Sequence, residues 1–561
     1  MNIQILKSPL VIAALATLLS ASAAFATEYT SSQTANGTAI ILNSGDIVSV
    51  SGDGTRALSG MSGGSFAINP SDGSISLVST GIVARTVRLD NASANLGSGS
   101  SIGSNYVGVD MTGTGSVFMA DNLAVTVGSS MVPVMPSGSN TNPCGIRAAD
   151  ASQMSLGSDT KISLYLSDDF GTSGRGLIAT GESTVLAVTD RLSVEITGGM
   201  LYGADYINQS PWGVSITSGG TADLGTNARI RVLEGAGVVS AGGGAAVILE
   251  NGVVEAGVAL IASQGASLAA TGGTFEGVGT EGVALLMFSG TVAISGSTLS
   301  SEGYAAINLA DGNNGDDGPG EVTVSGSIIT SAGSVISSSA INATHTTATT
   351  VTLQGGTQAS GETGILFVSD AGVNAASSVS VVVDGAGTAA AGRFIDGALS
   401  TSLTVRDGAS WASAGASAMD SLVLSEATVV LSLTALGDGI RAGQLTLEGA
   451  GKSEVSFTVA DSVVFSAEAV ASADGEYVWD ILTGTSVSGD YTASVNWNPA
   501  NTGNASATWM WEDLGGGQWR MYDIVVGTVP EPATHAVFAG LAMVACACVL
   551  RGRRCQVRHC G

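Results

Sequence analysis

Apolar and polar residues alternate over many short stretches of the chain. Clear examples are residues 123–127, 162–166, 192–196 and 403–405. Successive side chains of a β-strand point to opposite faces, so this alternation predicts strands with one buried face and one solvated face. No amphipathic helix of useful length is visible between the two ends of the chain. The pattern therefore predicts an all-β protein.

A second pattern recurs at longer intervals. A small residue, usually glycine, precedes an aliphatic residue, and another apolar residue often follows two positions later. Measured between the aliphatic residues, the intervals are 37, 31, 37, 33, 36, 24 and 58, and we interpret the last as containing a degenerate copy. The pairs are Gly108-Val109, Gly145-Ile146, Gly176-Leu177, Gly213-Val214, Ala246-Val247, Gly282-Val283, Ala306-Ile307 and Gly364-Ile365.

Recurrence at intervals of roughly 20–50 residues is typical of a solenoid, in which each coil is one repeat. Asp-Gly pairs at Asp311-Gly312, Asp384-Gly385 and Asp407-Gly408 predict tight turns between its strands. Parallel strands usually need helical crossovers, and this sequence lacks them. In a coiled chain each strand can instead pair with its counterpart one coil further on. The 79 glycines, 12% charged residues and 5% aromatic residues suit such an architecture.

Glycine-aliphatic strands that alternate with Ser/Thr-rich strands resemble the parallel β-helix passengers of autotransporter and adhesin-like proteins, a pectin-lyase-like solenoid. The resemblance covers residues 101–420 and implies a right-handed coil. It also implies a preceding N-terminal β region or cap at 27–100. True autotransporters end in the many strands of a membrane barrel, whereas this chain ends in one apolar segment, so self-translocation is not expected.

The first 26 residues have the organisation of a cleavable signal peptide. Lys7 supplies a positive start, and residues 10–19 form an almost wholly apolar run. Ala24 and Ala26 place small side chains at the cleavage positions. The apolar run is shorter than the roughly 18 residues that a spanning helix requires. We therefore expect cleavage after Ala26 and a chain exported from the cytoplasm.

The C-terminal segment combines three features. Pro530, Glu531 and Pro532 form a rigid start, and the stretch 533–550 carries no formal charge. The length of this stretch is at the lower limit for a transmembrane helix. Basic residues follow it directly, and the positive-inside bias keeps them cytoplasmic while the body lies on the far side. They are Arg551, Arg553 and Arg554, followed by the basic tail 555–561.

This order of features over residues 529–554 resembles the PEP-CTERM sorting signal of Gram-negative bacteria. The resemblance implies export, recognition by the cell-envelope sorting machinery, and transient anchoring in the inner membrane. Cleavage near the Pro-Glu-Pro motif would follow. The expected destination is the outer membrane, the cell surface or the extracellular medium.

Residues 421–528 contain fewer repeats and most of the tryptophans. Solenoid ends expose apolar surface and unpaired strand edges, so we interpret this region as a β-rich C-terminal cap. An alternative is a carbohydrate-binding module that stacks sugars on aromatic rings. The residues concerned are Trp479, Trp497, Trp509, Trp511 and Trp519.

The charge of the chain excludes one class of partner. Five of the 19 basic residues and none of the 46 acidic residues lie in residues 1–26 and 533–561, so residues 27–532 carry a net charge of −32. Such a field repels DNA, RNA and anionic lipid, so no nucleic-acid partner is expected. Glycans or exopolysaccharide remain candidate partners. Cys144 is the single cysteine of this span, which excludes an internal disulfide.

Few residues suggest catalysis or metal binding, and no cofactor is expected. His345 is the single histidine between the terminal segments. The two Gly-x-Ser-x-Gly matches, at 60–64 and 99–103, do not lie between a strand and a helix, as a nucleophile elbow requires. The oxygen-rich loop 311–318 offers weak calcium ligands, although a solvated turn is the preferred interpretation. The ligands would be Asp311, Asn313, Asp316 and Asp317.

Enzymes that cleave polysaccharides also use β-helices, so a surface polysaccharide lyase or glycoside hydrolase is the alternative function. Arg229 and Arg231 lie on the face of their strand opposite Ile230. Acidic residues at 168–169 and Glu195 could join a glycan cleft, but their separation cannot be inferred from sequence. The principal hypothesis is a surface protein without catalysis, with an adhesive, matrix or envelope structural role.

Overall fold

The computed structural model describes residues 26–526 except for several short segments, and within them the protein is all-β, with no helix. The chain forms two compact units, one of residues up to 390 with 397–400 and one of 391–396 with 401 onward. The segments not described within this range are 70–72, 82, 130–141, 168–172, 200–209, 311–318, 340–347, 369–375, 398, 436, 449–452, 460–475, 485–490, 497–505 and 516–517.

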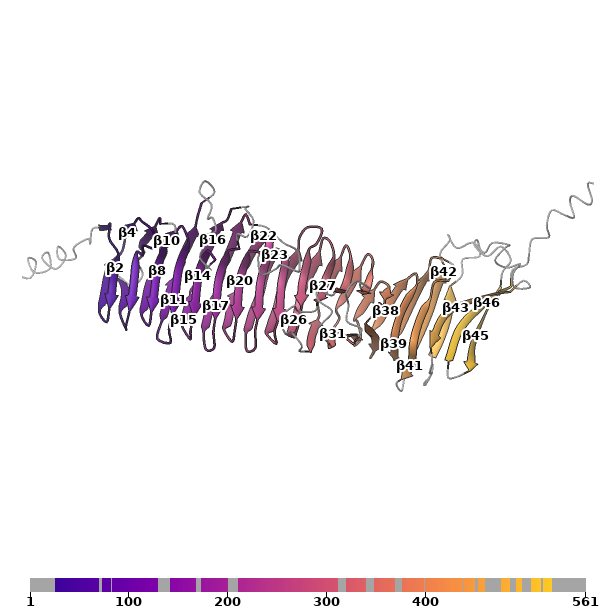
Figure 1. Cartoon of the computed structure of the whole chain (residues 1–561). Helices are drawn as coiled ribbons and strands as arrows, with labels where there is room; N and C mark the ends of the chain where they lie inside the picture. The colour runs from indigo at the N-terminus through magenta and orange to yellow at the C-terminus, as the bar shows by residue number, and fades with distance from the viewer. Residues whose placement is uncertain are drawn as a thin grey trace, which may run out of the picture. The chain divides into compact units, whose positions relative to one another are not determined.

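The first unit is a solenoid built from three parallel sheets, and each coil contributes one strand to each sheet (Figure 1). The first sheet contains β1 (Glu28–Tyr29), β4 (Ile47–Val50), β7 (Ser76–Ser79), β10 (Ser101–Ser104), β13 (Ala124–Val127), β16 (Lys161–Tyr165), β19 (Ser193–Thr197), parts of β22 (Arg229–Ala241), β23 (Ala246–Ser263), β24 (Ser267–Gly277) and β26 (Gly290–Ser301), then β29 (Ile328–Ser331) and β32 (Gln358–Gly361).

The second and third sheets repeat this pairing. The second contains β2 (Gln33–Asn36), β5 (Leu58–Met61), β8 (Arg85–Asp90), β11 (Val107–Thr112), β14 (Cys144–Ala149), β17 (Arg175–Thr180), β20 (Trp212–Thr217), parts of β22 and β23, β25 (Val283–Met287), β27 (Ala305–Ala310), β30 (Ser334–Ser339) and β33 (Gly364–Val368). The third contains β3 (Ala39–Asn43), β6 (Ser65–Asn69), β9 (Ser93–Ser98), β12 (Val117–Asp121), β15 (Gln153–Leu156), β18 (Val185–Val188), β21 (Thr221–Thr226), parts of β23, β24 and β26, β28 (Gly320–Ser325), β31 (Ala348–Gln354) and β34 (Ser378–Asp384).

The core of this unit consists of aliphatic side chains that repeat at one register position in successive coils. In the first sheet every member of one such row is at most 1% exposed. Burying an aliphatic side chain of this size stabilises a fold by about 1.5–3 kcal/mol. The alternation predicted for residues 123–127, 162–166 and 192–196 is confirmed, with the Leu, Val and Ile side chains buried. The row is Leu77, Ile102, Val125, Ile162, Val194 and Ile230.

The coil period predicted from sequence is partly confirmed. Val109, Ile146, Leu177 and Val214 occupy one register position of the second sheet. The next members are Val238 and Leu260, so the two coils after Val214 are shorter than the three that join Val109 to Val214.

Three pairs of the predicted series were assigned wrongly. Val247 lies in the third sheet, opposite Ala222. Val283 lies two positions before Leu285, the residue that occupies the register position in its coil. Ile365 likewise lies one position before Leu366. The last and longest interval does contain an additional coil, whose register residue is Ile336. Small-aliphatic pairs occur in more than one sheet, so their spacing alone does not identify the coil.

Glycines in the second sheet allow neighbouring coils and sheets to approach closely. A Cβ on Gly176 would lie 2.4 Å from the carbonyl oxygen of Gly213 in the next coil and 2.4 Å from Cγ1 of Val194 in the first sheet. Gly145 and Gly213 face equally close neighbours. The glycine of the recurring pair is therefore required because there is no room for a side chain at this corner.

Buried hydroxyls bond the backbone where the chain leaves one sheet for the next. The Ser327 Oγ accepts from Ser297 N at 3.1 Å, and the Thr357 Oγ1 accepts from Ser327 N at 3.3 Å. Stacked hydroxyls in this position supply acceptors for N–H groups that would otherwise be buried without a partner. Ser/Thr-rich corners are thus structural.

The second unit also contains parallel stacked strands, and it ends in antiparallel strands. Parallel ladders join β37 (Ser400–Arg406), β39 (Ser417–Ser425) and β41 (Ile440–Glu448), and join β38 (Ser410–Ala414), β40 (Thr428–Leu433), β42 (Ser453–Val459) and β44 (Tyr491–Asn496). Antiparallel pairs join β46 (Gln518–Val526) to β43 (Glu476–Gly484) and to β45 (Ser506–Gly515). The boundary expected between residues 420 and 421 falls within this unit.

The glycine contacts generate the first testable prediction. In the purified full chain, Gly176→Ala should lower the stability of the solenoid by about 1–3 kcal/mol, because the added methyl group overpacks the corner. Thermal unfolding followed by circular dichroism measures this as a lower Tm. Gly243→Ala is the control, since Gly243 is exposed and a Cβ there has no neighbour within 4 Å. Equal Tm values for the two variants would contradict the packing argument.

Candidate functional site

The outward face of the second sheet carries a cluster of basic residues near the N-terminal end of the solenoid. The register places Ser59, Arg88, Asp110 and Arg147 next to one another in four successive coils. Arg85 lies on the same strand as Arg88. Residues 27–532 contain only 14 basic residues, so this grouping departs strongly from the acidic average.

Asp110 organises the cluster. Its side chain is almost fully buried, and its Oδ2 accepts a hydrogen bond from Arg85 Nη1 at 2.6 Å. Its Oδ1 lies 3.8 Å from Arg147 Nε, beyond hydrogen-bond range, and has no hydrogen-bond donor among the described residues. One buried carboxylate therefore holds two guanidinium groups from the coils on either side of it.

Arg56 adds a further positive charge to this face. Backbone bonds from Arg85 N to Thr55 O and from Ala57 N to Thr86 O place it beside Arg85 in the neighbouring coil. Burial lowers the pKa of Arg56, and the charges of Arg88 and Arg85 lower it further. Among the described residues neither Arg56 nor Arg88 forms a salt bridge or donates a side-chain hydrogen bond. We call Arg56, Arg85, Arg88 and Arg147 the arginine cluster.

A hollow of about 590 Å³ adjoins the arginine cluster. Its wall includes Arg56 and the outward residues Thr34, Ser59 and Met61 of the second sheet. Seven of its eleven lining residues are serine or threonine, so the wall is mainly polar and offers hydroxyl donors and acceptors. Ser59 pairs directly with Arg88, which connects the hollow to the row of charged residues.

Further along the same face, Cys144, Arg175 and Trp212 follow one another in successive coils. The guanidinium carbon of Arg175 lies 3.7 Å from the centre of the Trp212 ring, and its Nη1 donates to the carbonyl oxygens of Gly174 (3.1 Å) and Ser210 (2.8 Å). Burial lowers the pKa of Arg175 to about 9, so the group is still protonated at neutral pH. These contacts give Arg175 a structural role.

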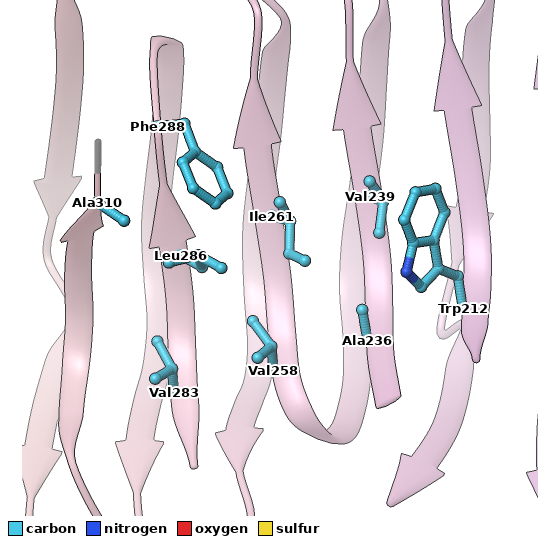
Figure 2. Close-up of a cluster of buried hydrophobic side chains, with 9 residues drawn as sticks. All are labelled: Trp212, Ala236, Val239, Val258, Ile261, Val283, Leu286, Phe288 and Ala310. Atoms are coloured by element: carbon cyan, nitrogen blue, oxygen red, sulfur yellow. The ribbon is translucent and has the colours of Figure 1, made fainter. Parts of the chain in front are cut away.

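The face then becomes apolar. Figure 2 shows the buried cluster that begins at Trp212 and continues over the outward register positions of the next coils. All its members are at most 9% exposed. They are Trp212, Ala236, Val239, Val258, Ile261, Val283, Leu286, Phe288 and Ala310. One sheet face thus changes from charged to apolar along the stack, which short windows of the sequence did not reveal.

Two residues named from sequence meet on the first sheet. Arg231 Nη1 lies 3.6 Å from Glu195 Oε1, and its Nε lies 3.3 Å from Glu255 Oε2. The side chains of Glu195 and Arg231 are 54% and 42% exposed, so this is a solvated ion pair of small energetic value. Arg229 is exposed on the same strand, as predicted, with Ile230 buried. None of these residues lines the hollow beside the arginine cluster.

Several predicted site residues lie outside the described residues. They are Ala24, the weak calcium ligands Asp311, Asn313, Asp316 and Asp317, the acidic pair 168–169, His345, the motif Pro530, Glu531 and Pro532, and the arginines Arg551, Arg553 and Arg554. Ala26 is described, is exposed, and directly precedes the first coil.

The first serine motif spans the end of β5 and the turn after it, and the second runs from a turn into β10. Ser62 follows β5 with a φ of 52°, and Ser101 begins β10, so neither motif opens a helix. In the described part of the chain no group of three or more His, Cys, Asp or Glu side chains is arranged to hold a metal ion. Over the same residues no helix is long and apolar enough to span a membrane.

Comparison with known proteins adds no functional assignment. The chain matches no protein-family model, and no curated protein matches its sequence. Function is therefore argued from the geometry of the chain itself.

The buried thiol generates the second prediction. Cys144 is buried, and burial raises its pKa well above the ordinary value, so the reactive thiolate is not formed at mildly alkaline pH. In a chain with Cys546, Cys548, Cys555 and Cys560 replaced by serine, a thiol reagent should modify nothing until guanidinium chloride unfolds the solenoid. Adding Val185→Cys, at a position 42% exposed, provides the reactive control. Rapid modification of native Cys144 would contradict the packing of this face.

Proposed function

We propose that the protein is an exported surface solenoid with an adhesive, matrix or envelope structural role and without catalysis. The observation that carries the proposal is the repetition of polar side chains on the outward faces of stacked coils. Ser300, Thr330 and Ser360 form one such row on the first sheet, and Ser295 and Ser325 neighbour each other on the third. A repeated row presents the same chemistry at intervals of about 4.8 Å, which suits contact with a repetitive polymer.

Neighbouring hydroxyls on the outward faces of the first and third sheets also bond across coils. Ser101 Oγ donates to Ser76 Oγ at 3.2 Å, and Ser295 Oγ donates to Thr271 Oγ1 at 3.3 Å. Each hydroxyl keeps further donor or acceptor capacity for a ligand. Glycans, including exopolysaccharide, are the partners that such a hydroxyl-rich surface would suit.

The proposed route to the surface depends on the two terminal segments. The signal peptide ending at Ala26 would direct export, and the Pro530–Pro532 motif with its apolar segment and arginines would engage the sorting machinery. The segment 533–550 would anchor the chain in the inner membrane until that step.

Removal of the sorting segment tests this route. A chain that ends after Pro532 should be released into the periplasm or the medium, because it lacks the apolar anchor and the arginines. Fractionation and immunoblotting of a Gram-negative host that exports the protein measure the distribution. A chain that ends after Arg554 is the matched control, since it keeps both features and should be retained. Unchanged surface retention of the shorter chain would refute the sorting role.

A glycan panel tests the role of the body. The purified full chain should bind one or more polysaccharides and release no shortened products or new reducing ends. Cleavage of any polymer would favour the alternative, a polysaccharide lyase or glycoside hydrolase. Glu195→Gln and Glu255→Gln would then show whether the carboxylates around Arg231 contribute. Absence of binding to every polymer would contradict the adhesive role.

A further inference from the structure

The arginine cluster departs locally from the charge of the chain. Asp110 holds Arg85 and Arg147, and Arg56 and Arg88 lie in neighbouring coils, whereas residues 27–532 carry a net charge of −32. Asp53 precedes the lining residue Gly54 and Asp90 pairs with the lining residue Met61, but neither is among the charged groups that shift the pKa of Arg56. A positive surface is thus maintained within an acidic protein, although like charges on adjacent strands repel one another.

Stability does not explain why these arginines are grouped. Arg85 and Arg147 are held by Asp110, but Arg56 and Arg88 make no salt bridge or side-chain hydrogen bond among the described residues. Both are half-buried, so each bears part of the cost of desolvating a charge. A ligand that carries negative charge would offset this cost.

The shape of the surface specifies an extended ligand. Ser59, Arg88, Asp110 and Arg147 occupy four successive coils, a length of roughly 14 Å at the usual spacing of about 4.8 Å between strands. The hollow of about 590 Å³ lies at one end of this row. A ligand would therefore lie along the direction in which the coils stack and enter the hollow at one end.

The chemistry of the surface specifies the class of ligand. Guanidinium groups bind carboxylates through paired N–H donors. The mainly Ser/Thr wall matches a ligand rich in hydroxyl groups. We propose that the arginine cluster and the adjoining hollow bind an acidic polysaccharide through its carboxylates. This inference rests on the proposed function and deepens it by naming the ligand class.

Polygalacturonate is a suitable probe, and its fully methyl-esterified form is the matched neutral polymer. The purified full chain should bind polygalacturonate with an affinity that falls as the salt concentration rises, and should bind the ester at least tenfold more weakly. Calorimetry or biolayer interferometry measures both. Failure to bind polygalacturonate, or equal binding of the ester, would overturn the proposal.

The double variant Arg56→Gln/Arg88→Gln locates the site. It should weaken polygalacturonate binding roughly tenfold or more without lowering the Tm, because neither side chain has a bonded partner to lose and their removal relieves repulsion between like charges. Arg191→Gln/Arg229→Gln removes two exposed positive charges elsewhere and should bind as the unmodified chain does. Equal losses in both variants would indicate a nonspecific charge effect and overturn the assignment.

Poly-L-glutamate distinguishes a glycan site from a site for acidic peptides. It carries carboxylates without the ring hydroxyls, so it should compete weakly. Tighter binding of poly-L-glutamate than of polygalacturonate would overturn the polysaccharide assignment. Surface retention is measured independently in the chain that ends after Pro532, so failure of the arginine site and failure of the sorting route are distinguishable.

Discussion

Backbone pairing between each coil and the next is the interaction on which the rest of this structure depends. Unpaired strand edges can pair with other chains and cause aggregation, but here each strand pairs with the strands of neighbouring coils in all three sheets of the first unit. The aliphatic rows are buried because the coils stack in register. Close stacking imposes its own constraint at the corners, where Gly145, Gly176 and Gly213 leave no room for a Cβ. Pairing, core and glycine positions are consequences of one geometry.

The same geometry leaves the outward positions free to vary. On the second sheet these positions change from hydroxyls at Ser59, through arginines and Asp110, to the apolar side chains that begin at Trp212 (Figure 2). On the first and third sheets they form rows of serine, threonine and glutamate. Function in such a scaffold depends on which side chains the register brings together.

Local patterns were sufficient for the class of fold and for the strands with one solvated face. The alternation at residues 123–127 and 162–166 predicts a strand directly, because successive side chains of a strand point alternately into the core and into solvent. It was insufficient for the second sheet, where strands such as β25 are buried on both faces and form continuous apolar runs. The arginine cluster was missed for a related reason: its four members come from three different coils, span residues 56–147 and share no motif.

Alternation, recurrence and the absence of helical patterns are local properties, so the sequence alone was enough to predict an all-β, coiled chain with recurring glycine–aliphatic pairs. Tertiary structure alone decided which residues become neighbours. The coil that joins Val238 to Leu260 is much shorter than the coil that joins Val109 to Ile146, so a contact between coils depends on the accumulated register and not on a constant spacing. The stacking register alone creates two sets of ion pairs: those of Asp110 with Arg85 and Arg147, and those of Arg231 with Glu195 and Glu255.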